Sequence, residues 1–318
     1  MPDPDTGTPV NSPEVLQIAH LSDPHLTSLH GVAWRELANK RILGYLSWFM
    51  GRKSQHQSGI LNILLQDLQE TRPDHIAVTG DLTQIGTAME CREAVHWLAR
   101  LGSPDRVTVI PGNHDRYTPA DWHETVGRWL PYLQDEPLMD PATLFPTLRC
   151  RASVALVGLC SAVPTLPFMA TGRLGESQLQ RFDSLLAGLA DRNMFRVILL
   201  HHGPLPGTNS FRRRLVDADD LISILKHRGA DLVLHGHGHR NTSGIIGTAA
   251  VDIPVFGVAS ASSVATSTSR TATYNLFRIT RQSRGWAVRL CFRSYNPYTG
   301  AFESGGSREI VRQQPHKS

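Results

Sequence analysis

The chain has 318 residues, of which 41% are hydrophobic and 19% are charged, so it can bury a large core. Its net charge of +4 is a mild basic excess, which suits a small anionic ligand and argues against a specific nucleic-acid-binding protein. No apolar stretch is long enough to span a bilayer, which excludes a helical integral membrane protein.

The two ends of the chain differ from the rest in composition. Residues 1–13 are acidic and proline-rich and lack the features of a signal peptide, so we expect a disordered tail. Residues 313–318 are expected to fray, which leaves residues 14–312 as one domain. The four cysteines fit no disulfide or zinc-finger spacing, so we expect reduced, mostly buried thiols and a cytoplasmic protein.

Strand and helix patterns alternate through most of this domain. Apolar runs typical of strands occur at residues 15–21, 75–79, 106–110, 154–159, 196–200 and 231–234. Helical patterns lie between several of them, at residues 60–70, 87–100, 177–190 and 218–228. This alternation is typical of an α/β protein whose sheet is covered by helices.

The pattern changes after residue 251, where residues 273–279 and 286–292 indicate antiparallel strands. In the second of these, Trp286, Val288 and Leu290 alternate with more polar positions. We therefore expect residues 251–312 to supply strands of a second sheet packed on the first. The predicted fold class is α/β: a four-layer α/β/β/α sandwich of two mixed sheets flanked by helices.

Residues 29–58 combine aromatic and basic side chains, among them Trp34, Trp48 and Phe49 beside Arg35 and Lys40. We expect a helical, cap-like insertion. It could cover an apolar substrate, touch a membrane surface through its basic flanks, or pack on the core of the protein. We favour packing on the core, because aromatic-rich helices are usually buried.

Five apolar runs are each followed by side chains that bind metal ions. These are Asp23 and His25, Asp81, Asn113 with His114 and Asp115, His201 with His202, and His237 with His239. Because ligands bind beyond the carboxyl ends of strands in open α/β sheets, we expect these side chains to converge. Asp81 could offer one oxygen to each of two cations. Nitrogen and oxygen donors without cysteine suit Mn, Fe or Zn and disfavour calcium.

The five motifs, present in this order over residues 23–239, together resemble the calcineurin-like metallophosphoesterase superfamily. Within it, the chain is most similar to the bacterial branch of cyclic-nucleotide and glycerophosphodiester phosphodiesterases. The resemblance implies two divalent or trivalent metal ions, with Mn, Fe and Zn as candidates. The implied ligands are Asp23, His25 and His239 at one site, Asn113, His201 and His237 at the other, and Asp81 between them.

The resemblance also implies a dinuclear metal-dependent phosphodiesterase, in which a hydroxide bridging the metals attacks phosphorus in a small phosphodiester. His114 would stabilise the phosphoryl oxygens or protonate the leaving alcohol, and Asp115 would orient its imidazole. The alternative is a phosphomonoesterase, or a nucleotide-sugar or lipid-linked pyrophosphatase, on the same site.

Three further residues are weaker candidates for substrate binding: Arg212, Arg213 and His202. An arginine could clamp a phosphate with two hydrogen bonds, but Arg212 and Arg213 lie in a basic run that is also typical of a solvated loop. We expect His235 to pack or hydrogen-bond nearby. The default interpretation of the histidines outside the motifs is structural; among them are His20, His30, His56 and His75. The sequence leaves the oligomeric state open, with a dimer as one option.

Overall fold

The computed structural model of the protein describes residues 14–26, 29, 32–49, 57–136, 140–265, 267, 269–283 and 285–311. The predicted tails at residues 1–13 and 313–318 lie outside this range. Within the described part of the chain, no helix combines the length and the apolar character needed to cross a membrane.

Every strand and helix predicted above is present. The strands are β1 (Val15–Leu21), β2 (His75–Val78), β3 (Val107–Val109), β4 (Thr147–Arg151), β5 (Val154–Gly158), β6 (Phe195–Leu200), β7 (Leu232–His235), β8 (Thr242–Ile246), β9 (Ile253–Gly257), β10 (Thr273–Gln282), β11 (Gly285–Asn296) and β12 (Ala301–Val311). The α-helices are α1 (Trp34–Leu37), α2 (Arg41–Ser47), α4 (Ser58–Thr71), α5 (Ala88–Leu101), α6 (Leu130–Leu133), α7 (Glu176–Ala190) and α8 (Ala218–Arg228). Short 3₁₀ turns occur at η2 (Val126–Trp129), η3 (Pro141–Thr143) and η4 (Phe211–Arg213). Sequence analysis missed β4, β8, β9 and β12.

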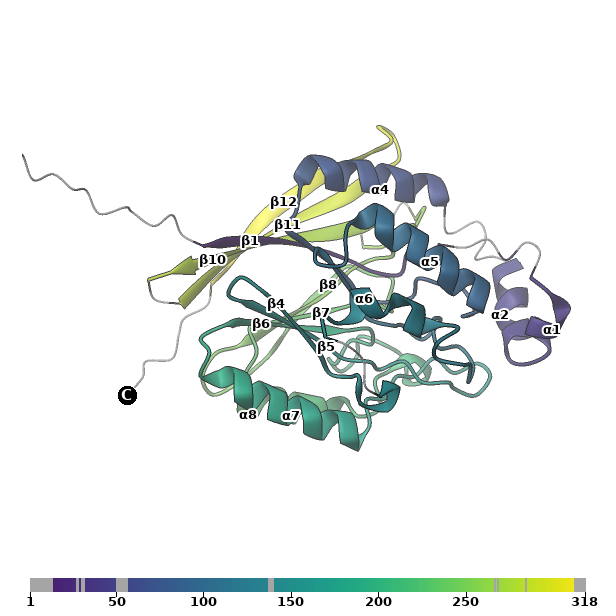
Figure 1. Ribbon diagram of the computed structural model, residues 1–318. Helices are drawn as coiled ribbons and strands as arrows, with labels where there is room; N and C mark the ends of the chain where they lie inside the picture. Colours follow the sequence, from purple (N-terminus) through teal and green to yellow (C-terminus); the bar gives the residue numbers. More distant parts are fainter. Residues whose placement is uncertain are drawn as a thin grey trace, which may run out of the picture.

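The strands form two six-stranded sheets, in the orders β12-β11-β10-β1-β2-β3 and β4-β5-β6-β7-β9-β8. Both sheets are mixed, because each contains parallel and antiparallel pairs. Figure 1 shows α4 and α5 over the outer face of the first sheet and α7 and α8 under the second. The predicted four-layer α/β/β/α sandwich is confirmed.

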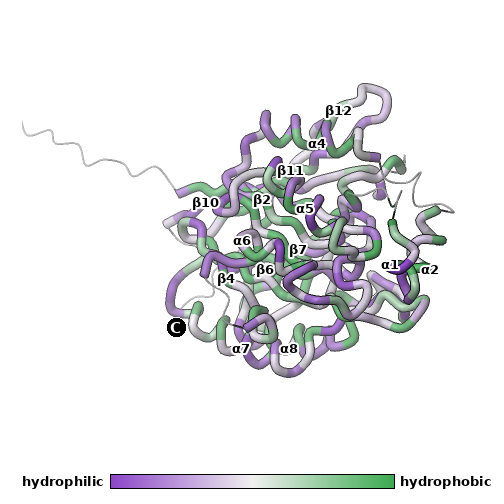
Figure 2. Tube along the Cα trace, turned by 45° about the vertical axis from the view of Figure 1, so that its right-hand side comes forward, coloured by the Kyte–Doolittle hydropathy of each residue, from purple (hydrophilic) through white to green (hydrophobic). Residues whose placement is uncertain are grey.

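The apolar residues of β6 show how this architecture is encoded. Val197 and Leu199 point into the core between the two sheets, whereas Ile198 and Leu200 pack in the cluster beneath α7 and α8. Successive side chains of a strand point to opposite faces, so a strand buried on both faces is apolar throughout. In Figure 2 the hydrophobic colouring gathers along the inner strands near β2, β6 and β7, and α4 alternates between hydrophilic and hydrophobic turns.

The second sheet differs from the prediction. We expected residues 251–312 to supply it, but within that range only β9 joins it, and β10, β11 and β12 extend the sheet of β1. β10 runs antiparallel to β1 along the edge that β2 does not occupy. This pairing satisfies the backbone groups of β1, which would otherwise present an open edge. Alternation predicts a strand but does not say which sheet it joins.

The described part of the 29–58 insertion consists of residues 29, 32–49, 57 and 58, and its helices α1 and α2 lie to one side of the four layers (Figure 1). Trp48 is buried in a small cluster with Ile85, against which Tyr45 and Tyr117 also pack. The expected packing on the core is therefore correct for one face of α2. The other face carries exposed apolar side chains.

Candidate metal centre

The candidate metal ligands come from the carboxyl ends of strands in both sheets. Asp23 and His25 follow β1, Asp81 follows β2 and Asn113 follows β3, all in the first sheet. His201 follows β6, and His237 and His239 follow β7, in the second sheet. The convergence expected from the sequence is present, and it joins the ends of the two sheets.

The backbone is held in an unusual conformation at these positions. Asp23, His25, Asp81, His237 and His239 all have positive φ angles, between 45° and 64°. Residues other than glycine rarely adopt such φ angles, and the backbone strain persists only where the surrounding structure enforces it. Five of the nine non-glycine residues with positive φ in the described chain are thus candidate ligands, which marks this region as functional.

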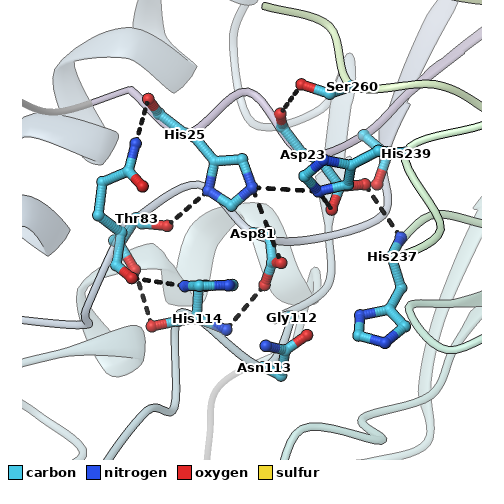
Figure 3. A network of polar contacts seen from close by, with 12 residues as sticks. Asp23, His25, Asp81, Thr83, Gly112, Asn113, His114, His237, His239 and Ser260 are labelled. Atoms are coloured by element: carbon cyan, nitrogen blue, oxygen red, sulfur yellow. Dashed lines mark hydrogen bonds and ion pairs between the residues drawn. The ribbon is translucent and has the colours of Figure 1, made fainter. Parts of the chain in front are cut away.

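The first group of ligands is Asp23, His25, Asp81 and His239, whose donor atoms lie within 4.8 Å of one another. Nε2 of His239 is 3.1 Å from Oδ1 of Asp23 and 3.3 Å from Nε2 of His25. Figure 3 shows these side chains turned toward one another. The loops that carry them are paired by backbone hydrogen bonds, from Asp23 N to Gly80 O and from His25 N to Asp81 O.

The second group lies beside the first and contains His201, Asn113 and His237. Nε2 of His201 is 3.1 Å from Oδ1 of Asn113 and 3.4 Å from Oδ2 of Asp81. The His201 and His237 rings are 5.1 Å apart. Oδ1 of Asp81 accepts a hydrogen bond from the backbone of His114, so Oδ2 is the oxygen that faces both groups. This differs from our expectation of one oxygen for each cation.

The residues present fit a pair of metal ions. Nδ1 of His25 lies 3.0 Å from Thr83 O, and Nδ1 of His201 lies 2.7 Å from Thr79 O. A carbonyl accepts only, so each Nδ1 carries a hydrogen and Nε2 faces the site, where a metal ion would take the lone pair that a proton otherwise holds. Nε2 of His237 is buried and has no hydrogen-bond partner among the residues that the structure describes. Buried polar atoms normally have one, and a metal ion would satisfy this nitrogen.

Two glycines allow the loops to approach this closely. A Cβ at position 112 would lie 2.2 Å from Oδ1 of Asp81, and one at position 236 would lie 1.9 Å from Oγ of Ser22. Any side chain at either position would displace a ligand loop, which explains the glycines that precede Asn113 and His237.

Charge in the centre is dominated by its buried carboxylates. Burial alone raises the pKa of Asp81, but the imidazoles of His201 and His114 outweigh this effect and hold the pKa well below its usual range. Burial alone lowers the pKa of His201, but the Asp81 carboxylate raises it to about 9. Burial, with His202 and His201 nearby, holds the pKa of His237 well below its usual value. The centre thus concentrates negative charge where cations would bind.

Asp115 does not contact the His114 ring in the way expected of it. The His114 ring nitrogen Nδ1 donates to the carbonyl of Gln84, and the ring stacks on Tyr117 with centroids 5.7 Å apart. Asp115 does not orient this ring. Both of its carboxylate oxygens accept hydrogen bonds from backbone N–H groups, those of Asp81, Thr83 and Gly112. The reason is geometric: the carboxylate is turned into the loops at the ends of β2 and β3, so it holds the ligand loops together.

The three weaker candidates lie near the centre but differ in exposure. Arg213 donates a 2.7 Å hydrogen bond to the carbonyl of His237, so it supports a ligand loop. Arg212 is exposed on η4, and its role in substrate binding stays a prediction. His202 is fully buried; its Nε2 donates to Ala170 O and its Nδ1 accepts from Ser161. Both ring nitrogens are engaged, yet His202 offers a nitrogen within 4.8 Å of those of His201 and His237, so its role in substrate binding stays a prediction.

The remaining histidines and the cysteines follow the expected pattern with one exception. His20 and His75 hydrogen-bond to threonines, and His235 contacts Gly236 O, as expected for structural residues. His30 and His56 lie outside the described residues. All four cysteines are free thiols, but only Cys91 and Cys160 are buried, whereas Cys291 is half-buried and Cys150 is exposed, so the expectation of mostly buried thiols is met by two of the four.

Sequence analysis missed the groups that orient the ligands. The carbonyls of Thr79, Thr83 and Gln84 act through the backbone, so their side chains give no signal. Tyr117 follows Asp115 by two residues, and this proximity to the motif is the signal that could have identified it.

Comparison with known proteins agrees with this geometry. Residues 16–241 match the family model described as calcineurin-like phosphoesterase. A curated relative, a probable cyclic nucleotide phosphodiesterase from a Synechococcus strain, is 27% identical over 178 residues, which cover 55% of this chain and 61% of the relative's length.

Two solved structures share the fold. A dimetal phosphatase from Danio rerio superposes with a TM-score of 0.58 at 12% identity, covering 93% of this chain and 98% of that one. GAP50, the anchor in the inner membrane complex of Plasmodium, gives a TM-score of 0.52 at 12% identity, covering 95% and 90%. At such identities the likeness establishes the architecture alone.

Proposed function

The chain belongs to the calcineurin-like phosphoesterase family, and we propose that it is a dinuclear metal-dependent phosphodiesterase acting on a cyclic nucleotide or a glycerophosphodiester. The observation that carries the proposal is the convergence of ligands from five strand ends around Oδ2 of Asp81, which faces His25 at 4.0 Å and His201 at 3.4 Å. The preference for a diester is supported by the Synechococcus relative.

The residues that would hold the metals are those named above. Asp23, His25 and His239 would hold one ion, Asn113, His201 and His237 the other, and Asp81 would contact both. When bound, the ions would lower the pKa of water and provide positive charge opposite the phosphoryl oxygens. The oxygen and imidazole donors favour Mn, Fe or Zn.

The chain's own residues position and protonate the substrate. The Gln84 carbonyl and the Tyr117 ring fix the orientation of His114, whose T-shaped contact with His25 places it beside the first ligand group. From there its imidazole can donate a hydrogen bond to a phosphoryl oxygen, or a proton to the leaving alcohol. Asp115 acts only through the backbone that it holds, so it is a positioning residue.

The test is a substrate panel measured after reconstitution with Mn, Fe or Zn. It begins with bis(p-nitrophenyl) phosphate beside p-nitrophenyl phosphate, and continues with 2′,3′- and 3′,5′-cyclic nucleotides and glycerophosphodiesters. We expect a higher kcat/KM for the diesters. Faster turnover of the monoester, or of a nucleotide-sugar or lipid-linked pyrophosphate, would replace this proposal by its alternative on the same centre. We further propose that the enzyme works in the cytoplasm, in keeping with its free thiols.

A further inference from the structure

The described chain exposes ten large hydrophobic side chains, and seven of them lie on three neighbouring segments. These segments are residues 34–49, the loop at residues 165–169, and residues 211–214. We call the seven side chains the apolar rim; its members are Trp34, Ile42, Leu46, Phe49, Leu166, Phe168 and Phe211. Trp34 and Phe168 are each 78% exposed.

Hydrogen bonds hold the three segments together. Nζ of Lys40 donates to Oγ1 of Thr165 at 2.7 Å, which ties the α1–α2 region to the loop. The backbone N–H of Ala170 donates to Arg212 O at 2.9 Å, which ties the loop to η4. The rim is therefore one surface assembled from three parts of the chain.

Residues 41–49, which are α2 and the two helical residues after it, are apolar on two faces, but the described chain covers only one of them. Tyr45 and Trp48 pack inward, near Ile85 and Tyr117. Ile42, Leu46 and Phe49 follow at intervals of four and three residues, which places them on a single outer face. A helix that is apolar on both faces is expected to bury both.

The loop at residues 165–169 exposes its apolar side chains from a strained backbone conformation. Met169 N donates to Leu166 O, and Phe168 has a φ of +64° after Pro167, as at the third position of a type II turn. Glycine or asparagine normally occupies that position, since a bulky residue there is strained. Strained backbone of this kind often accompanies a functional contact, so the exposed Phe168 is a candidate for contact with a partner outside the chain.

The charges of the three segments determine which partner fits. The segments hold six basic residues and one acidic residue, Glu36, which is half-buried. The exposed bases are Arg35, Arg212, Arg213 and Arg214, and the guanidinium of Arg214 lies over the Phe211 ring. Exposed aromatic and aliphatic side chains on the same segments as exposed arginines match the interface of an anionic bilayer, where apolar groups enter the acyl boundary and cations meet the headgroups.

We propose that the apolar rim docks the protein on an anionic phospholipid surface. The rim adjoins the candidate centre: Lys40 lies over the Tyr117 ring at 4.6 Å, and Tyr117 stacks on His114. Docking would therefore bring the centre close to the membrane. The inference goes beyond the proposed activity and is tested without metal or substrate.

The experiment measures cosedimentation with vesicles of phosphatidylcholine alone or enriched in phosphatidylglycerol. The rim variant is Leu46→Ser/Phe49→Ser/Phe168→Ser. The matched control is Ile245→Ser/Tyr298→Ser, which removes exposed apolar side chains of β8 and the β11–β12 turn. We expect the wild type and the control to bind the anionic vesicles. We expect the affinity of the rim variant for these vesicles to fall by at least about tenfold.

Tryptophan fluorescence of the wild-type protein gives a second measurement, with one conservative variant as its control. Trp34 is 78% exposed, whereas the other five tryptophans are buried or half-buried. We expect anionic vesicles to shift the emission to the blue and protect it from iodide, and Trp34→Phe to remove both effects. Absent binding, equal binding to both vesicle types, or equal losses in the rim and control variants would overturn the proposal. A dimer dispersed by the rim substitutions would assign the surface to contact between copies instead.

Discussion

The ligand loops and the apolar rim are neighbours in the structure but differ in burial, backbone strain and the number of contacts that hold them. The loops are buried, strained and held together by hydrogen bonds, as those from Asp23 N–H to Gly80 O and from Thr83 N–H to the Asp115 carboxylate illustrate. The rim is exposed and held by few contacts, notably those of Lys40. A metal centre needs fixed donors, so its residues are dictated by chemistry. A docking surface needs only apolar and basic character, so many sequences would serve.

The largest effect is expected for Asp81→Ala. This change removes the carboxylate that faces both ligand groups, and we predict a loss of about 10³-fold or more in kcat together with bound metal. Metal content is measured by mass spectrometry beside steady-state kinetics. Asp67→Asn is the control, since Asp67 is an equally buried aspartate that pairs with Arg293 far from the ligand loops. It should lower stability and leave the metal in place; metal loss in both variants would make the Asp81 effect structural.

His114→Ala should have the next largest effect. It removes a proton donor that is no ligand, so we predict a fall of about 10²–10⁴-fold in kcat with metal content unchanged. The fall should be steeper for alcohols that are poor leaving groups, which a series of substituted phenyl diesters would measure. A variant that loses a metal ion would place His114 among the ligands.

Arg213→Ala tests the boundary between the two regions, because Arg213 is exposed yet bonded to the His237 carbonyl. We predict about 10–100-fold weaker affinity for one metal, as is usual when a supporting contact of a ligand is lost. Metal titration by calorimetry measures this affinity. Arg212→Ala is the matched control, and an identical loss there would point to general charge rather than support of the loop.

A buried histidine outside both regions, His75, shows an effect of burial on stability, to which Arg151 and Arg149 add. Burial lowers the pKa of His75 to about 3 in the folded protein, whereas in the unfolded chain His75 has its ordinary pKa of 6.5. Between pH 6.5 and pH 3, His75 binds a proton in the unfolded state but not in the folded state. The free energy of unfolding is therefore highest above pH 6.5 and decreases as the pH falls toward 3. His75→Gln should therefore reduce the stability difference between pH 7 and pH 5 by about 2 kcal/mol, measured by urea unfolding. An unchanged difference would mean that His75 is protonated in the folded state.

The sequence predicts the centre better than the rim. Its ligands follow strand ends, and parallel strands end at the same edge, so convergence could be inferred from spacing. The role of Asp115 could not be inferred in this way, because its position beside His114 in the chain does not reveal which way its side chain points. The rim was seen only as an aromatic segment, since the contribution of Phe168 depends on a turn and on the contact between Lys40 and Thr165.

The missed strands have physical reasons of their own. β9 contains Pro254, which lacks the N–H of a ladder and argues against a strand. β12 is an edge strand with two adjacent glycines, so little alternation remains. β4 carries Arg149, whose fully buried guanidinium pairs with Asp135, and sequence patterns place arginine on surfaces.

The most direct test of the two-metal centre is anomalous diffraction from crystals of protein reconstituted with Mn or Zn. We predict two peaks per chain, one contacted by Asp23, His25 and His239 and the other by Asn113, His201 and His237, with Asp81 touching both. A single peak, or peaks that Asp81 does not touch, would contradict the account.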